Sequence, residues 1–198
     1  MTDLFQEPGD ATPLEAEERE QILQTWITSR ADLNSAEAAN IIDGAAWVRG
    51  LRRRRVADAL TPELALRLHA RMFGEVWRWA GTYRTTPRNI GIDAYRIATE
   101  VVQLMGDVRY WVENKTYASD DIAARFHHRL VAIHPFPNGN GRHARMMADI
   151  LIERLGGTPF SWGGGSLTDT GELRARYVTA LRAADNHDIG LLLAFARS

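Results

Sequence analysis

The sequence contains no cysteine and only one lysine, Lys115, among its 24 basic residues. Without cysteine, the chain forms no disulfide, uses no thiolate nucleophile and builds no cysteine zinc site. No apolar run approaches the ~20 residues that a membrane-spanning helix needs. The acidic, polar N-terminal sequence does not resemble a signal peptide. We therefore expect a cytoplasmic protein that has no membrane partner.

Neither sign of charge dominates the chain. The formal net charge is -1 over 198 residues, which gives no general attraction for nucleic acid or for an anionic membrane. The hydrophobic fraction of 45% and the charged fraction of 25% are typical of a globular domain with a buried core. We expect one domain, residues 14–198, preceded by a flexible arm, residues 1–13.

Apolar spacing and capping residues predict an all-α fold of about eight helices. A first helix is expected from Leu14, because four apolar residues recur at helical spacing: Ile22, Leu23, Trp26 and Ile27. A second helix is expected around residues 35–51, after an Asn-Ser cap. Thr61 followed by Pro62 predicts a third helix start, because proline suits the first helical position.

Residues 82–97, "TYRTTPRNIGIDAYRI", lack the helical period of their neighbours. They combine β-branched and aromatic residues with Pro87 and an Asn-Ile-Gly turn, which is typical of a short hairpin or an extended segment. The remaining chain shows no alternation of strands and helices that would indicate a parallel sheet. We therefore expect a helical domain with one small β-hairpin.

The stretch "HPFPNGNGRHAR", residues 134–145, combines features that suit an anion site. Pro135 and Pro137 break the preceding helix and stiffen the turn. The Gly139-Asn140-Gly141 sequence is expected to take positive φ angles and to expose consecutive N–H groups. A helix that begins around Gly141 directs its positive dipole end into the same space.

The charged residues of this stretch indicate which anion it binds. Arg142 and Arg145 are spaced i, i+3 near a helix N-terminus, where cations oppose the dipole unless an anion lies between them. A polyphosphate fits this arrangement, and His134 is placed to act as a general base. Taken singly, a histidine, a glycine turn or two arginines more often serve structure alone. Their combination within twelve residues favours a site, but not a P-loop, because the Lys-Ser/Thr ending is missing.

These residues resemble the signature of Fic-domain proteins, which reads His-Pro-Phe, any residue, Asp or Glu, Gly-Asn-Gly-Arg, two residues, Arg. The helical layout over residues 35–195 is also similar to that family, and the whole chain resembles its subgroup labelled mobile mystery protein B. The resemblance implies a protein adenylyltransferase. Such an enzyme transfers AMP from ATP, with Mg²⁺, to a Ser, Thr or Tyr hydroxyl of a target protein, which can include the enzyme itself.

The resemblance also implies residue roles. His134 is the base, Gly139, Asn140 and Gly141 form the anion hole, and Arg142 and Arg145 hold the outer phosphates. A flap docks the target protein by strand addition, and it comprises Gly91, Ile92, Asp93, Ala94, Tyr95, Arg96 and Ile97. Trp162, in a glycine-rich loop, is a further candidate for contact with the nucleotide's adenine ring or with a partner protein.

The chain departs from the family pattern at Asn138, where the family carries the magnesium-binding acid. Asparagine offers an oxygen without charge, so the metal should bind more weakly. Three interpretations remain: weaker catalysis, a different donor or metal arrangement, or a non-catalytic nucleotide-binding module.

A second departure lies in "SAEAAN", which resembles the family's inhibitory helix motif. Ser35 and Asn40 match that motif, but Ala39 replaces the glutamate that pairs with the second arginine, here Arg145. Arg145 is then free for phosphate, either naturally or through an engineered substitution. The target protein, the nucleotide donor and the formation of homo-oligomers stay open.

Overall fold

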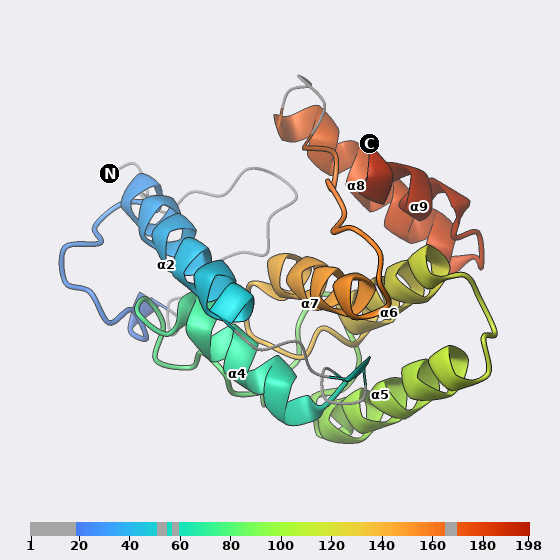
Figure 1. The fold of residues 1–198 in the computed structure, drawn as a ribbon. Helices are drawn as coiled ribbons and strands as arrows, with labels where there is room; N and C mark the ends of the chain where they lie inside the picture. The colour runs from blue at the N-terminus through green and yellow to red at the C-terminus, as the bar shows by residue number, and fades with distance from the viewer. Residues whose placement is uncertain (1–18, 51–54, 57–59, 165–169) are drawn as a thin grey trace.

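The structure is a computed structural model that describes residues 19–50, 55–56, 60–164 and 170–198. It confirms the all-α fold class. Figure 1 shows the α-helices, which in chain order are α2 (Arg30–Gly50), α4 (Pro62–Phe73), α5 (Ile97–Glu113), α6 (Ser119–Ile133), α7 (Asn140–Arg154), α8 (Thr170–Asp185) and α9 (Gly190–Arg197). The expected arm, residues 1–13, and the start of the first expected helix lie outside the described residues.

The helices pack in pairs around a shared apolar core. α2 packs against α4, α6 packs against both α5 and α7, and α8 packs against α9 (Figure 1). Large buried side chains such as Phe73, Trp77 and Phe126 fill the space between them. Because α6 and α7 are joined by residues 134–139, the pair brings the end of one helix and the start of the next to one place. No helix in the described part of the chain is long and apolar enough to cross a membrane.

Two helix starts show how local chemistry sets the elements. α4 begins as predicted, because the Oγ1 of Thr61 accepts the N–H of Leu64 at 3.1 Å ahead of Pro62. α2 begins five residues earlier than the predicted residue 35. The carboxylate of Asp32 accepts the N–H of Ser29 at 2.9 Å, and this turn starts the helix without the expected Asn-Ser cap.

The expected helix through residues 22–27 is wrong. In the structure, the Leu23 N–H donates to the Val76 carbonyl at 2.9 Å, and the Arg78 N–H donates to the Gln21 carbonyl at 3.0 Å. Ile22 and Trp77 form an isolated antiparallel bridge. Backbone pairing with a distant segment therefore replaces the helical bonds, and it leaves Trp26 56% exposed.

The expected β-hairpin in residues 82–97 does not form. Ala94–Arg96 is a short 3-10 helix that runs directly into α5. Two backbone bonds join the segment to the end of α6 and the start of the motif: the Arg84 N–H donates to the Pro135 carbonyl at 2.9 Å, and the Ile92 N–H donates to the Ile133 carbonyl at 3.4 Å. An extended segment fits the sequence pattern, but its backbone partners, Ile133 and Pro135, lie far along the chain, beyond α5 and most of α6.

Candidate active site

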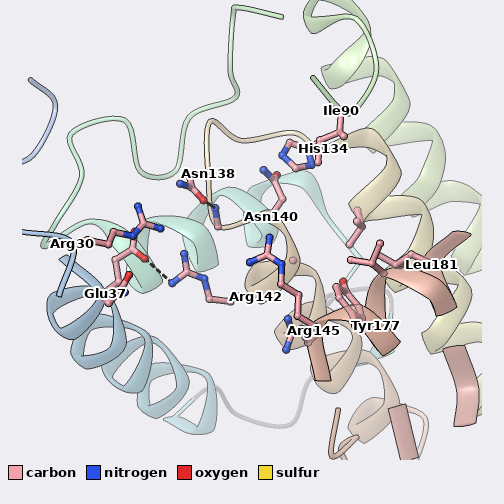
Figure 2. A pocket seen from close by; sticks show the side chains of 16 residues that line it. Arg30, Glu37, Ile90, His134, Asn138, Asn140, Arg142, Arg145, Tyr177 and Leu181 are labelled. Atoms are coloured by element: carbon pink, nitrogen blue, oxygen red, sulfur yellow. Dashed lines mark hydrogen bonds and ion pairs between the residues drawn. The ribbon is translucent and has the colours of Figure 1, made fainter. Parts of the chain in front are cut away.

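A pocket of about 510 Å³ opens where α2, α6, α7 and α8 meet (Figure 2). Seven motif residues line it: His134, Asn138, Gly139, Asn140, Gly141, Arg142 and Arg145. The other walls come from α2, α8 and two further positions, and they comprise Arg30, Asn34, Glu37, Ile90, Val131, Arg174, Tyr177, Val178 and Leu181. The structure therefore gathers the predicted base, anion hole and phosphate residues around one cavity.

His134 ends α6 in an unusual backbone conformation. Its φ of 53° and ψ of 61° are left-handed, which side-chain-bearing residues rarely adopt. The residue is buried, and neither imidazole nitrogen has a hydrogen-bond partner among the described residues. Burial lowers the pKa of His134 to about 4, and the positive charges of Arg84 and Arg88 add to this effect. At neutral pH the ring is therefore uncharged and has a nitrogen available to accept a proton.

The Gly139-Asn140-Gly141 stretch differs from its predicted geometry. Gly139 alone among the three has a positive φ, 77°, and a Cβ there would lie 2.5 Å from the Phe73 ring. Asn140 and Gly141 instead form the first turn of α7, and no side chain caps that helix. A first helical turn leaves its N–H groups without carbonyl partners. The helix end, rather than a run of left-handed residues, therefore faces the pocket as an anion site.

The Asn140 side chain holds the turn together instead of facing an anion. Its Oδ1 accepts the Phe136 N–H at 2.9 Å, and its Nδ2 donates to the Phe136 carbonyl at 2.8 Å. Phe136 is fully buried, so these bonds fix the turn to the core.

His69 also supports this turn, and sequence reasoning missed it. Its Nδ1 accepts the Gly81 N–H at 3.0 Å, so the proton is on Nε2, which donates to the Asn138 carbonyl at 3.1 Å. The ring stacks on Phe136 with a centroid distance of 3.7 Å. Burial first, and then the charge of His143, lower the pKa of His69 well below its ordinary value. A lone histidine on an apolar helix face carries no sequence signal of this role.

The two motif arginines have different surroundings (Figure 2). Nη1 of Arg142 lies 2.6 Å from Oε2 of Glu37, a buried carboxylate on α2 whose Oε1 accepts the indole N–H of Trp77 at 2.7 Å. The guanidinium of Arg145 lies over the Tyr177 ring at 4.9 Å. Arg142 therefore already has an anionic partner, whereas Arg145 contacts an aromatic face.

The predicted inhibitory motif has a different phase on α2. Ser35 and Ala39 are exposed and do not line the pocket, while Asn40 is buried and its side chain bonds the Arg71 carbonyl and the Glu75 N–H. The face toward the pocket carries Arg30, Asn34 and Glu37, at i, i+4 and i+7. Sequence reasoning missed Glu37 because the matched motif places its acid two residues later.

Asn138 lines the pocket, but its environment does not make a magnesium site. Its Oδ1 accepts the Gly139 N–H at 2.6 Å, which leaves one neutral, already bonded oxygen. Among the described residues, no cluster of three His, Cys, Asp or Glu side chains stands ready for a metal. Because Mg²⁺ prefers carboxylates together with substrate phosphates, these residues alone do not fit the ion.

The expected flap residues, 91–97, lie beside the pocket rather than in its wall. Gly91 packs so closely on His134 that an added Cβ would lie 2.5 Å from the His134 Cβ. Tyr95 is 84% exposed, whereas Ile97 begins α5 inside the core. Ile97 is therefore unable to contact a target protein, which corrects its assignment to the docking flap.

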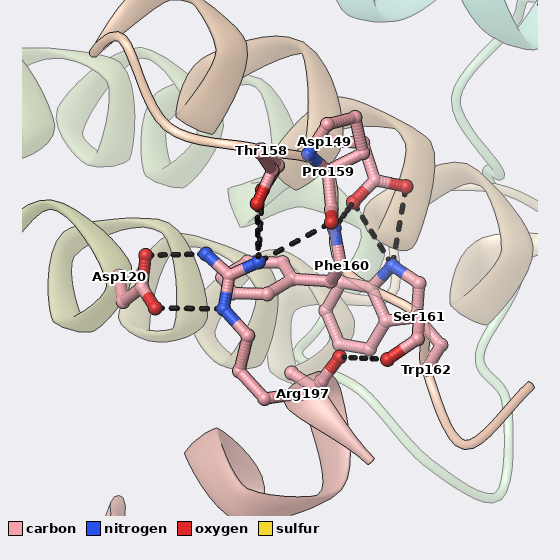
Figure 3. A network of polar contacts seen from close by, with 9 residues as sticks. Asp120, Asp149, Thr158, Pro159, Phe160, Ser161, Trp162 and Arg197 are labelled. Atoms are coloured by element: carbon pink, nitrogen blue, oxygen red, sulfur yellow. Dashed lines mark hydrogen bonds and ion pairs between the residues drawn. The ribbon is translucent and has the colours of Figure 1, made fainter. Parts of the chain in front are cut away.

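Trp162 is a core residue and does not line the pocket, although the sequence made it a candidate for ligand contact (Figure 3). Its indole N–H donates to both carboxylate oxygens of Asp149, at 3.0 and 3.1 Å. Burial raises the pKa of Asp149 to about 6. In the same network, Arg197 forms a bidentate pair with Asp120 at 2.5 and 2.7 Å, which ties α9 to the start of α6. The network lies apart from the pocket and stabilises the packing of the C-terminal helices.

Fold and site together define an all-helical domain that presents a histidine, a helix N-terminus and arginines to one cavity. The sequence model of the Fic/DOC family matches residues 59–152, which include most of the site. The chain therefore carries a Fic/DOC family domain. The narrower resemblance to the mobile mystery protein B subgroup stays a prediction.

Curated relatives carry a consistent name. The chain is similar to the protein adenylyltransferase fic-1 of Caenorhabditis briggsae, at 32% identity over 128 residues, covering 63% of this chain and 24% of that protein. It is similar to the fic-1 protein of Caenorhabditis elegans at 30% identity over 136 residues, covering 67% of this chain and 25% of that protein. The chain thus spans about a quarter of the length of these relatives.

Solved structures support the fold. Residues 134 to 508 of Fic-1 from C. elegans match with a TM-score of 0.65 at 23% identity, covering 88% of this chain and 50% of that one. BepC, a VirB-translocated effector of Bartonella tribocorum solved with bound AMPPNP, matches with a TM-score of 0.69 at 19% identity, covering 92% of this chain and 97% of that one. At these identities the likeness concerns the fold.

Proposed function

We propose that this protein is a protein adenylyltransferase, which transfers AMP from ATP to a hydroxyl side chain of a target protein. The observation that carries the proposal is the convergence of His134, the N-terminus of α7 and Arg145 on one pocket. Relatives named protein adenylyltransferase and a similar fold solved with bound AMPPNP support the same donor class.

The chemistry follows from these groups. The target hydroxyl attacks the α-phosphate in line, its proton passes to an imidazole nitrogen of His134, and pyrophosphate leaves. The uncharged state of His134 at neutral pH suits a proton acceptor. The N–H groups at the start of α7 stabilise charge on the phosphates, and Arg145 contacts the outer ones.

The described residues supply little to a magnesium ion, so this mechanism takes no step through one. When bound, Mg²⁺ would neutralise phosphate charge. The Asn138 side-chain oxygen stands at the position of the family's magnesium-binding acid. A non-catalytic nucleotide-binding module is the second candidate, and Asn138 is the observation that favours it.

We further propose that Glu37 restrains the site. Its ion pair with Arg142 occupies the guanidinium that the sequence motif assigns to a phosphate. A triphosphate that uses Arg142 must displace a buried carboxylate, which weakens nucleotide binding. In this proposal the restraining pair is Glu37 with Arg142, whereas the sequence motif pairs an acid at position 39 with Arg145.

The deciding experiment incubates the protein with ATP labelled on the α-phosphate and with candidate targets, the protein itself included. We expect labelling that His134→Ala lowers about 100-fold or more, the usual contribution of a general base. The isosteric variant His134→Gln serves as a control that keeps the size of the side chain.

Labelling that survives both substitutions would contradict the role of His134. Nucleotide binding without any labelling, measured by calorimetry, would instead favour the binding module. Absence of both would remove the nucleotide assignment.

A further inference from the structure

Arg84 is a buried arginine outside the motif that makes an unusual set of contacts. Only 3% of its surface is exposed, although its guanidinium carries a full charge. The charge is distributed over three backbone carbonyls instead of a carboxylate: Nε donates to His134 at 2.7 Å, Nη1 to Thr86 at 2.9 Å and Nη2 to Ile92 at 2.5 Å. A buried cation is costly to retain, so we asked which backbone segments these three bonds hold in place.

The Nε bond of Arg84 fixes the backbone of His134, the proposed general base. His134 is held in the left-handed region, which costs about 1 kcal/mol or more for a residue with a side chain. The Arg84 Nε bond to the His134 carbonyl and the Arg84 N–H bond to the Pro135 carbonyl hold two consecutive peptide groups of that turn. This conformation directs the imidazole toward the pocket, where its nitrogens are unpartnered.

The other two side-chain bonds of Arg84 fix the segment that covers the base. Because Arg84 bonds the carbonyls of Thr86 and Ile92, it closes residues 86–92 into a loop. Gly91 of this loop lies against the His134 Cβ, and Ile90 reaches the pocket beside the His134 ring (Figure 2). The same guanidinium therefore touches both the base and its cover.

We propose that Arg84 is a positioning residue that locks His134 and the loop of residues 86–92 into one unit, so that the base and the apolar wall at Ile90 keep a fixed relation. The proposal rests on the proposed function for its catalytic consequence. Its structural content, the coupling itself, does not depend on which reaction the site performs.

The test compares Arg84→Met with Arg84→Lys and with the matched control Arg88→Met. Arg84→Met removes the charge and all three bonds, whereas Arg84→Lys keeps the charge but not the three-way fork. Arg88 is the other arginine whose charge lowers the pKa of His134, so Arg88→Met removes a nearby charge and leaves the Arg84 bonds in place.

Two readouts separate positioning from general damage. In Arg84→Met we expect the labelling rate at saturating ATP to fall about 100-fold, because displaced reacting groups lose rate steeply, while the Kd for ATP stays within about twofold. By NMR, the contact between the Gly91 α-protons and the His134 β-protons should disappear. Arg84→Lys should lie between Arg84→Met and the unaltered protein, and Arg88→Met should keep the contact and lose much less rate than Arg84→Met.

An NMR titration adds a third readout. Both methionine variants should raise the pKa of the His134 ring, because each removes a positive charge that faces it. A shared pKa change with an unshared loss of rate would assign the effect to geometry instead of charge.

The proposal is overturned if Arg84→Met keeps the Gly91–His134 contact, or if its ATP affinity falls in parallel with its rate. Should Arg84→Met fail to fold, Arg84→Lys carries the same test with the same outcomes. Should the unaltered protein label nothing, the proposed function fails, and the NMR contact still decides the coupling.

Discussion

The motif, residues 134–145, and helix α2 build two walls of the same pocket, yet they are held in different ways. The motif turn is fixed from within and from behind, by the Asn140 side chain, the His69 ring and Arg84. α2 contributes to the pocket through one face, whose strongest contact is the ion pair of Glu37 with Arg142. The motif wall is therefore held by bonds within and behind the turn, whereas the pocket face of α2 meets the motif through an ion pair.

The two walls therefore suit two different tasks: fixed geometry for the base and the anion site, and a releasable contact for the restraint by Glu37. A base and an anion site need fixed geometry, which buried and fully bonded groups provide. A restraint must be able to release, and one ion pair at a pocket wall can exchange its carboxylate for a phosphate. We therefore expect damage to the motif wall to cost stability, and changes on α2 to alter ligand affinity.

Acid should have the largest effect, on the buried core of α6 and α7 behind the motif wall. Burial lowers the pKa of His127 to about 3 and that of His143 to about 4, compared with 6.5 when exposed. As the pH falls below 6.5, the unfolded chain takes up protons before the folded one does, so stability is lost until the folded pKa values are reached. By pH 4 the loss should be on the order of 3 kcal/mol for each of these rings.

Urea unfolding at pH 7, 5.5 and 4.5 measures this loss. The raised pKa of Asp149 acts in the opposite direction between about pH 6 and 4 and offsets part of it. In His127→Phe the free energy of unfolding should depend less steeply on pH, because about one proton fewer is taken up on unfolding. A free energy of unfolding that stays constant from pH 7 to 4.5 would contradict buried, neutral imidazoles.

His69→Phe should give the next largest effect. The substitution keeps an aromatic ring against Phe136 but leaves the Asn138 carbonyl and the Gly81 N–H without their partner. We expect a loss of about 2–4 kcal/mol in the free energy of unfolding, measured with urea at pH 7. The control is Ser35→Ala, an exposed α2 position outside the pocket that should change stability by less than about 0.5 kcal/mol. Equal effects of the two variants would erase the contrast between the walls.

Glu37→Gln should act on affinity instead of stability. Glutamine retains an oxygen for the Trp77 indole but releases Arg142 from its ion pair. We expect ATP to bind about tenfold more tightly, measured by calorimetry, because each 1.4 kcal/mol corresponds to a factor of ten.

The matched control for this change is Ala39→Glu, which places a new acid on the exposed face of α2 and should leave ATP affinity unchanged. If Ala39→Glu lowers the affinity and Glu37→Gln does not raise it, the inhibitory position is residue 39, as the sequence motif predicts. The ion pair of Glu37 with Arg142 is then irrelevant to nucleotide binding.

Asn138→Asp should give the smallest effect. The added charge improves this position as a magnesium ligand, so we expect the Mg²⁺ concentration for half-maximal labelling or nucleotide binding to fall by several-fold. ATP affinity in EDTA should fall slightly, because the carboxylate then faces phosphate without a metal. Identical behaviour of both proteins with and without Mg²⁺ would show that the metal does not meet this residue.

The contrast between the walls also explains what the sequence could predict. The motif is dense in residues with narrow conformational preferences, and its break after His134 and the positive φ of Gly139 were accessible from local chemistry. The all-helical fold and the start at Pro62 followed from periodicity and capping in the same way.

Features that depend on distant partners were not accessible. The α2 segment is rich in alanine and places a charged and an amide residue, Glu37 and Asn40, among its buried positions, so no apolar stripe reveals its rotation. Residues 22–27 have a helical period but bond the backbone beyond α4 instead. The extended segment up to Ile92 was recognised as irregular, yet its pairing with Ile133 and Pro135 required the tertiary structure.

The left-handed backbone of His134 has a consequence for how this chain tolerates change. Glycine and, to a smaller degree, asparagine adopt that conformation at lower cost, and neither buries an unpartnered imidazole. Random substitution followed by selection for solubility or heat resistance is therefore expected to enrich replacements of His134 that abolish a histidine-dependent reaction. For an engineer, a gain in melting temperature at this position signals lost chemistry, so stability screens of this domain need an activity filter.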